Sequence, residues 1–189
     1  MEKKHTIEKT ILPNIKNIIM VASGKGGVGK STVAAGLAFK LSMEGYAVGL
    51  LDADIYGPSM PTLFNLHQEK PSVVEKEGKN RIIPFIRFGI KLVSIGCFID
   101  SRQALLWRGP MASNSLKQLV EDTDWGGLDY LIIDTPPGTG DIHITLLQQY
   151  MIDGALIITT PQVIALSDVQ KAITMFRDQH VGVPVLGVV

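Results

Sequence analysis

A glycine-rich segment ending in Lys-Ser-Thr is the part of the chain whose residue types most clearly predict a chemistry. Residues 24–32 read GKGGVGKST and satisfy the pattern G-x-x-x-x-G-K-[ST]. A loop that wraps a pyrophosphate turns successive backbone N–H groups inward, and glycine permits the positive φ angles and the close approach that this requires. Lys30 can then reach the β- and γ-phosphates, and the Ser31 hydroxyl can ligate Mg²⁺. The segment predicts binding of a nucleoside triphosphate.

The residues expected to bind the nucleotide form one short stretch, with one addition downstream. They are Gly24, Lys25, Gly26, Gly27, Val28, Gly29, Lys30, Ser31 and Thr32, together with Gly138. The alternative is a glycine-rich turn that carries a surface lysine. The flanks argue against it, because a strand-like apolar run precedes the loop and an amphipathic helical pattern follows it. The positive end of that helix adds attraction for phosphate.

Three aspartates that follow apolar runs are expected near the phosphates. Asp52 and Asp54 come after one run, and Asp134 ends another. In an α/β sheet the carboxyl ends of the strands share one edge, so these carboxylates should lie beside the phosphate loop. Asp134 can there hold Mg²⁺ through coordinated waters. For Asp52 and Asp54 the alternative is that they only cap the turn before Pro58.

The six residues after Asp134, TPPGTG at 135–140, are named the switch segment below. Stiff prolines followed by flexible glycines suit a loop that changes position when a γ-phosphate is present. The backbone N–H of Gly138 is the candidate sensor. Asp141 precedes a helical pattern and is expected to be its N-cap.

Alternating apolar runs and helical patterns predict the fold. The runs are 18–22, 47–52, 92–95, 130–134, 155–160 and 185–189, and the helical patterns are 30–44, 111–122, 142–150 and 166–178. Runs apolar on both faces are typical of buried parallel strands. We therefore expect an α/β fold, with a doubly wound, mostly parallel sheet and helices on both faces, over residues 15–189 after an N-terminal extension over 1–14.

Several smaller features are less decisive. Residues 81–95 can form a small antiparallel excursion, and the polar stretch 67–80 is expected to be a mobile surface loop. The four histidines, His143 among them, are isolated and show no metal-ligand spacing, so each is expected to be a surface or core residue. Cys97 lies in an apolar stretch and is expected to be a buried, inert thiol.

The composition counts against several classes of partner. The 189-residue chain carries 18 Lys and Arg residues and 18 Asp and Glu residues, so its formal net charge is zero. No global field attracts nucleic acid or anionic lipid, and we expect neither as a partner. The apolar runs are far shorter than the roughly 20 residues that a membrane span needs. The mixed charges of the N-terminus and the single cysteine predict a cytoplasmic location.

Lys25 needs a separate explanation, because a second lysine is not required to cradle phosphate within one subunit. The run GKGGVGKST resembles the deviant Walker A loop of the MinD/ParA group of P-loop ATPases. That resemblance implies a homodimer that meets through its nucleotide faces, in which Lys25 reaches the partner's nucleotide. The alternative is a solvated lysine on the loop.

Further segments resemble one branch of that group, the Mrp/ApbC family of iron–sulfur cluster carrier ATPases. They are LLDADIYGPSMP at 50–61, WRGPM at 107–111, DYLIIDTPPGTGD at 129–141 and TTPQVIALSDVQKAI at 159–173. Within WRGPM, Trp107 is expected to pack, Pro110 to stand in a helix first turn, and Arg108 to be either an interface contact or a solvated side chain.

The resemblance implies Mg²⁺-dependent, slow ATP hydrolysis that gates cluster transfer to iron–sulfur apoprotein clients. It makes Lys25, Lys30 and Asp54 the catalytic residues, with Asp54 orienting or activating the attacking water. It places Asp52 in the second shell of the metal, which completes the metal set Ser31, Asp52, Asp54 and Asp134.

The chain departs from the family at its C-terminal end. Family members continue into an Asn-containing segment that helps to hold adenine and a CxxC pair that binds a [4Fe–4S] cluster, whereas this chain stops at Val189. We therefore expect a truncated or fragmentary member that lacks the cluster ligands. Two alternatives stay open: a non-catalytic nucleotide-binding module, and a MinD/ParA-like positioning ATPase, which the zero net charge disfavours.

Overall fold

The structure is a computed structural model that describes residues 9–67, 69–76, 78–98, 110–179 and 181–189. Trp107 and Arg108 lie outside the described residues. The strands are β1 (Ile15–Ser23), β2 (Val48–Asp52), β3 (Val73–Lys76), β4 (Lys79–Ile82), β5 (Phe85–Arg87), β6 (Ile90–Ser94), β7 (Leu128–Asp134), β8 (Gly154–Ile158) and β9 (Val185–Val188). The helices are α1 (Lys30–Met43), α2 (Met60–Leu63), η1 (Ile95–Cys97), α4 (Pro110–Glu121), α5 (Asp141–Gln149) and α6 (Val163–Arg177).

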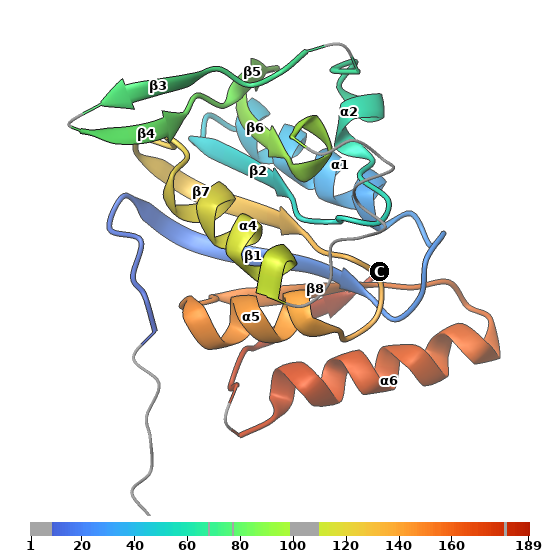
Figure 1. Cartoon of the computed structure of the whole chain (residues 1–189). Helices are drawn as coiled ribbons and strands as arrows, with labels where there is room; N and C mark the ends of the chain where they lie inside the picture. Colours follow the sequence, from blue (N-terminus) through green and yellow to red (C-terminus); the bar gives the residue numbers. More distant parts are fainter. Residues whose placement is uncertain (1–8, 68, 77, 99–109, 180) are drawn as a thin grey trace, which may run out of the picture.

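Seven strands form one sheet in the order β5-β6-β2-β7-β1-β8-β9 (Figure 1). The pairings from β6 to β9 are parallel, and β5 joins β6 in antiparallel register. Successive side chains of a strand point to opposite faces, so Met20 and Val21 of β1 enter different cores. Both are fully buried, as expected for a sheet covered on both sides.

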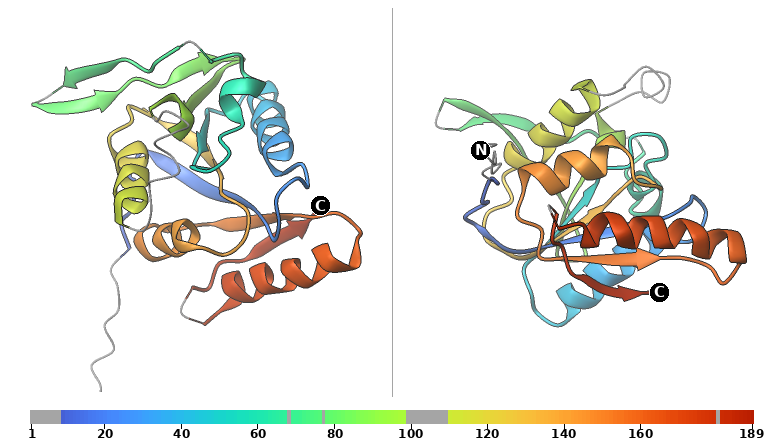
Figure 2. Two further views of the ribbon diagram at one scale, coloured as in Figure 1. Left: turned by 45° about the vertical axis from the view of Figure 1, so that its right-hand side comes forward. Right: turned by 90° about the horizontal axis from the view of Figure 1, so that it is seen from below.

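Helices cover both faces of the sheet (Figure 2). Residues of α1 and α2 pack into one core, and residues of α4, α5 and α6 pack into the other. This confirms the predicted α/β, doubly wound and mostly parallel fold. All six expected strands and all four expected helices are present, with ends displaced by three residues or fewer.

The segment between Gly24 and Gly45 shows why α1 starts and stops where it does. Gly29 precedes the helix with a φ of 88°, and Gly45 follows it with a φ of 89°, angles that few other residues adopt. Ala34 and Ala38 are fully buried against the sheet, because their small side chains permit close packing. Lys30 is therefore the first helical residue, and its side chain starts at the carboxyl edge of the sheet.

The polar stretch 67–80 is not simply a loop. It contains β3 and the start of β4, which pair in an antiparallel hairpin that extends away from the main sheet (Figure 1). The side chains of β3 are all exposed, so the hydrophobic periodicity that marks a buried strand is absent here. The antiparallel excursion expected within 81–95 is confirmed as the pair β5 and β6, which turns at Phe88 and Gly89, both with positive φ.

Residues ahead of the sheet are attached to the domain from Lys9 onward. The backbone N–H of Thr10 donates to the carbonyl of Gln149 at 2.6 Å, and Leu12 packs against a core. Pro110 is the first residue of α4, as the sequence predicts.

Candidate nucleotide-binding site

The glycine-rich loop connects β1 to α1 at the carboxyl edge of the sheet. Gly27 and Gly29 have φ angles of 78° and 88°, which confirms the conformational need for glycine at these two positions. Gly24 has another reason to be glycine. A Cβ there would lie 2.6 Å from the backbone carbon of Asp168. The absence of a side chain at Gly24 therefore lets α6 pack against the loop. The loop glycines were expected to supply positive φ or room for close approach; Gly24 and Gly26 do not have positive φ, and Gly24 shows the close approach.

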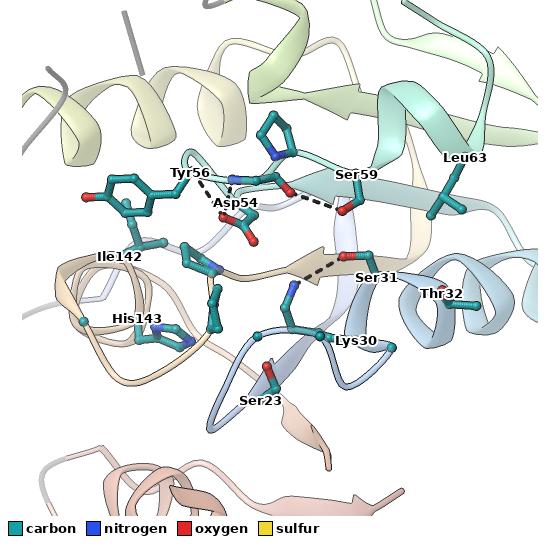
Figure 3. A pocket seen from close by; sticks show the side chains of 18 of the residues that line it. Ser23, Lys30, Ser31, Thr32, Asp54, Tyr56, Ser59, Leu63, Ile142 and His143 are labelled. Atoms are coloured by element: carbon teal, nitrogen blue, oxygen red, sulfur yellow. Dashed lines mark hydrogen bonds between the residues drawn. The ribbon is translucent and has the colours of Figure 1, made fainter. Parts of the chain in front are cut away.

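A cleft of about 990 Å³ opens beside the loop (Figure 3). Six of the ten residues predicted to bind the nucleotide line it: Gly26, Gly27, Gly29, Lys30, Ser31 and Thr32. The opposite walls come from the segment after β2, which includes Asp54, and from the switch segment. The cleft therefore brings the loop, one of the aspartates and the switch segment together, as the sequence predicts for a phosphate site.

Lys30, which lines the cleft, forms a buried ion pair with Asp134, which lies behind it and does not line the cleft. Lys30 Nζ lies 2.5 Å from Asp134 Oδ1, and the two side chains are 7% and 0% exposed. Burial raises the pKa of Asp134, while the charge of Lys30 and hydrogen bonds from Lys30 and Ser31 oppose that rise. The second oxygen, Asp134 Oδ2, is buried without a hydrogen-bond partner among the described residues. A buried carboxylate oxygen without a protein donor fits a magnesium ion or one of its waters.

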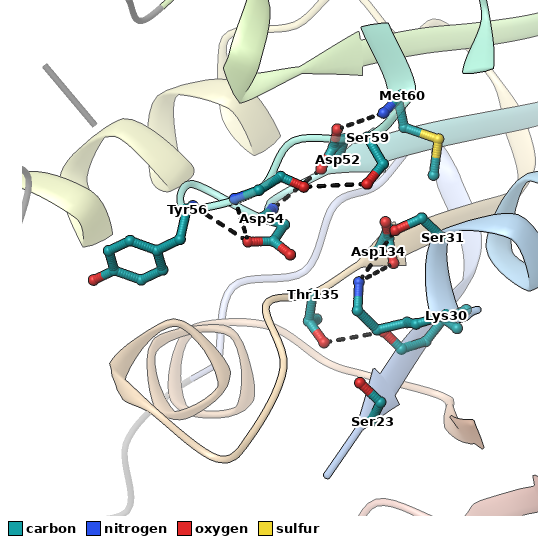
Figure 4. Close-up of polar contacts among 12 residues, drawn as sticks. Ser23, Lys30, Ser31, Asp52, Asp54, Tyr56, Ser59, Met60, Asp134 and Thr135 are labelled. Atoms are coloured by element: carbon teal, nitrogen blue, oxygen red, sulfur yellow. Dashed lines mark hydrogen bonds and ion pairs between the residues drawn. The ribbon is translucent and has the colours of Figure 1, made fainter. Parts of the chain in front are cut away.

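Asp52 is a structural hub (Figure 4). Its carboxylate accepts hydrogen bonds from the backbone of Asp54 at 3.1 Å and Met60 at 3.0 Å, and from Ser94 Oγ at 2.9 Å. Burial, helped by the nearby charge of Asp134, raises the pKa of Asp52 to about 7. Asp52 is not among the residues that line the cleft. Its hydrogen bonds fix the loop between β2 and α2, as the capping alternative predicts.

Asp54 combines capping with access to the cleft. Its Oδ1 accepts from the backbone N–H of Tyr56 at 3.2 Å and of Gly57 at 3.1 Å. The other carboxylate oxygen points into the cleft (Figure 3). One oxygen thus shapes the loop, and the second is placed to meet a ligand or water.

The switch segment is held against the end of β1. Thr135 Oγ1 donates to the carbonyl of Val21 at 3.0 Å, and the backbone N–H of Gly138 donates to the carbonyl of Ser23 at 2.8 Å. The proposed phosphate sensor is therefore engaged within the protein in this structure. Gly138 has a φ of 89°, so a side chain would strain this turn.

Near the switch segment the structure corrects the assignment of Asp141 and bears out that of His143. Asp141 is the first residue of α5 and not its N-cap, which is Gly140 in an extended conformation; Asp141 still favours the positive helix end. His143 is a core residue, one of the two possibilities left open, but it also borders the cleft. Sequence reasoning missed this because one histidine in a helical pattern carries no signal of what it faces.

Cys97 is only partly buried, in contrast to the expectation of a buried thiol. Burial, followed by the charges of Asp52 and Glu69, raises its pKa to about 11, so the thiol is protonated and unreactive at neutral pH. Within the described ranges, no group of three or more His, Cys, Asp or Glu side chains is arranged to hold a metal ion. No helix in the described part of the chain is both long and apolar enough to cross a membrane.

Comparison with known proteins decides the family. Residues 14–189 match the sequence profile of the NUBPL iron-transfer P-loop NTPases, within the ParA group. The chain belongs to this family. Among curated relatives, an iron–sulfur cluster carrier protein from Aquifex aeolicus is 54% identical over 179 residues, covering 94% of this chain and 48% of its own length. One from Rickettsia felis is 50% identical over 189 residues, 100% of this chain and 57% of its own.

Solved structures share the fold of this chain. A nucleotide-binding protein from Archaeoglobus fulgidus in complex with ADP is 42% identical, with a TM-score of 0.77 over 94% of this chain and 67% of its own. The cell division ATPase MinD from Pyrococcus furiosus shares the fold, with a TM-score of 0.62 at 20% identity over 91% of this chain and 70% of its own. The chain spans about half the length of the curated relatives it matches.

Proposed function

We propose that the protein binds Mg–ATP in the cleft and hydrolyses it slowly, and that its nucleotide state gates the transfer of an iron–sulfur cluster to apoprotein clients. The observation that carries the proposal is the buried pair of Lys30 and Asp134 at the foot of the glycine-rich loop. Membership of the iron-transfer family and an ADP-bound relative support it.

The pair explains how the site can hold a buried ammonium. Without nucleotide, Asp134 neutralises Lys30. A triphosphate offers Lys30 several anionic oxygens, so Lys30 exchanges partner, and Asp134 becomes free for the metal. Ser31, Asp134 and Asp54 are the residues proposed to hold Mg²⁺ directly or through water, and Asp52 fixes the loop that carries Asp54. A bound magnesium ion would neutralise charge that builds up on the phosphates during transfer.

Asp54 is the proposed residue that orients the attacking water. Its unshared oxygen faces the cleft, while its other oxygen is fixed by two backbone N–H groups. A carboxylate fixed in this way needs little reorganisation to position a water molecule. Phosphoryl transfer relies mainly on such positioning, so slow turnover is compatible with this small set of groups.

Pairing of two copies is the proposed link between nucleotide and cargo. Lys25 lies on the loop but is not among the residues lining the cleft of its own chain, so its side chain is available to a second copy. The N–H of Gly138 would exchange Ser23 for the γ-phosphate, which would move the switch segment only when ATP is bound. The chain has one cysteine and clusters ordinarily take four, so we assign it the nucleotide-dependent part of cluster transfer. A cytoplasmic location remains a prediction.

The test is a calorimetric titration of the full chain with ATP and ADP, with Mg²⁺ and with EDTA, followed by a phosphate-release assay. We expect binding that Mg²⁺ strengthens, and slow release of phosphate. Folded protein that gives no heat with either nucleotide would overturn the proposal. Binding with phosphate release at background would instead select the non-catalytic nucleotide-binding module.

A further inference from the structure

His143 is a buried histidine that borders the nucleotide cleft without any hydrogen-bond partner for its ring. It is the third residue of α5 and is 0% exposed. Among the described residues, neither Nδ1 nor Nε2 is paired. The ring belongs to the cleft wall with Pro136 and Pro137 of the switch segment, and Figure 3 shows it turned from the first turn of α5 toward the phosphate loop.

A buried imidazole without a partner among the described residues is unfavourable. Buried polar groups nearly always have a partner, and one without a partner destabilises the fold. A leucine could occupy much of the same space without that penalty. The polar ring therefore points to a ligand that pairs with it in another state of the protein.

The chemistry of the ring indicates what kind of ligand this is. Burial, followed by the positive charge of Lys30, lowers the pKa of His143 to about 4, so the ring is neutral at pH 7. A neutral imidazole carries one N–H donor and one acceptor nitrogen. The charge of Lys30 reaches the ring, so an anion that pairs with Lys30 also comes within electrostatic reach of the imidazole N–H.

We infer that His143 is a further nucleotide-sensing residue, whose imidazole N–H donates to an oxyanion of the bound phosphate chain, directly or through one water. The inference rests on the proposed function, because it requires a nucleotide in the cleft. The switch segment leads into the first turn of α5, where His143 lies. His143 therefore connects the occupant of the cleft to the position of α5.

Three variants test the inference: His143→Leu, His143→Gln and, as a control on the same helix, Gln148→Leu at an exposed position. Dissociation constants for Mg–ADP and Mg–ATP are measured by calorimetry, and unfolding midpoints are measured with and without nucleotide. We expect His143→Leu to unfold at or above the wild-type temperature without nucleotide, because it removes an unpaired polar group. Its nucleotide affinity should fall about tenfold, the scale of one hydrogen bond to a charged acceptor.

His143→Gln keeps a donor and an acceptor, so it should stay within about threefold of wild type, and Gln148→Leu should bind like wild type. The inference is overturned if His143→Leu binds as tightly as wild type, or if it unfolds earlier without nucleotide, which would make the ring a packing group. Equal loss in His143→Gln would overturn it as well. A wild-type protein that does not bind either nucleotide would refute the proposed function itself.

Discussion

At the scale of single residues, Lys30 and Asp134 neutralise each other's charge inside the protein. The ammonium and the carboxylate are both almost fully buried and lie 2.5 Å apart. Buried charges lose their hydration, so each of the two depends on the other for stability. The same pair fixes the position of the Lys30 ammonium at the end of the glycine-rich loop.

Removing Lys30 should therefore harm both stability and binding. Lys30→Met leaves Asp134 buried without its counter-charge, and we expect a loss of about 3 kcal/mol in the free energy of unfolding together with no detectable nucleotide binding. The double variant Lys30→Met/Asp134→Asn should recover most of the stability and none of the binding. Urea denaturation and calorimetry measure the two effects. A double variant as unstable as the single one would contradict this account.

His143 predicts a pH dependence of stability. Its pKa is about 4 in the fold, against 6.5 when unperturbed. Above pH 6.5 the ring is neutral in both states and contributes no pH dependence. As the pH falls from 6.5 to 4, the unfolded chain takes up a proton that the folded protein refuses, so stability should fall by up to roughly 3 kcal/mol.

The comparison of wild type with His143→Leu isolates this effect. Asp52, whose pKa is raised to about 7, titrates in the same range with the opposite sign, and its contribution is present in both proteins. Urea denaturation between pH 4 and 7 should show that the stability of wild type relative to the variant decreases by up to roughly 3 kcal/mol as the solution is acidified. Parallel curves would contradict the low pKa of His143.

At the scale of elements, the contact between the phosphate loop and α6 leaves no room for a side chain at Gly24. Gly24 faces the backbone and Cβ of Asp168 so closely that a methyl group would overlap both. The helix must therefore shift if this glycine gains a side chain. The phosphate loop is thus supported by α6 as well as by the two elements that it connects.

Two alanine substitutions test this support. Gly24→Ala should destabilise the protein by about 1–3 kcal/mol through overpacking and should also weaken nucleotide binding. Gly36→Ala, in the middle of α1 with open space around the position, should stabilise the protein by roughly 1 kcal/mol through helix propensity. Thermal unfolding of both variants checks the pair. Equal midpoints for the two variants would show that the contact with α6 is unimportant.

At the scale of the whole molecule, the strand order assembles the site. β7 lies between β1 and β2, and the parallel register places Asp52 opposite Asp134. The loop after β1 and the carboxylates after β2 and β7 consequently meet at one sheet edge, where parallel α/β folds bind ligands. Lys25 lies on this edge but does not line the cleft.

This arrangement predicts that Lys25 matters for pairing and not for binding by one copy. Lys25→Ala should bind Mg–ATP with an affinity within about threefold of wild type, yet it should lose ATP-dependent dimerisation. Sedimentation velocity with a slowly hydrolysed ATP analogue measures the oligomeric state, and calorimetry measures binding. If Lys25→Ala lost binding as completely as Lys30→Met, the interface role would be wrong.

Local pattern was enough to predict the phosphate loop, the six main strands and the four main helices. These features depend on residues that are close in sequence: glycines at fixed spacing, apolar runs, and a period near 3.6 residues. The hairpin of β3 and β4 was missed because its exposed strands lack that periodic signal. Membership of the iron-transfer family likewise followed from ordered motifs and agrees with the profile match.

Only the tertiary structure determined which interactions the individual polar side chains make. The sequence placed Asp52, Asp54 and Asp134 at one edge, but only packing showed that Asp52 holds a loop, that Asp54 turns one oxygen to the cleft and that Asp134 is paired with Lys30. The sequence also did not show that the buried ring of His143 lacks a partner among the described residues, or that Gly24 lies close to α6. Burial and pairing depend on residues that are distant along the chain, and spacing within one segment carries no record of them.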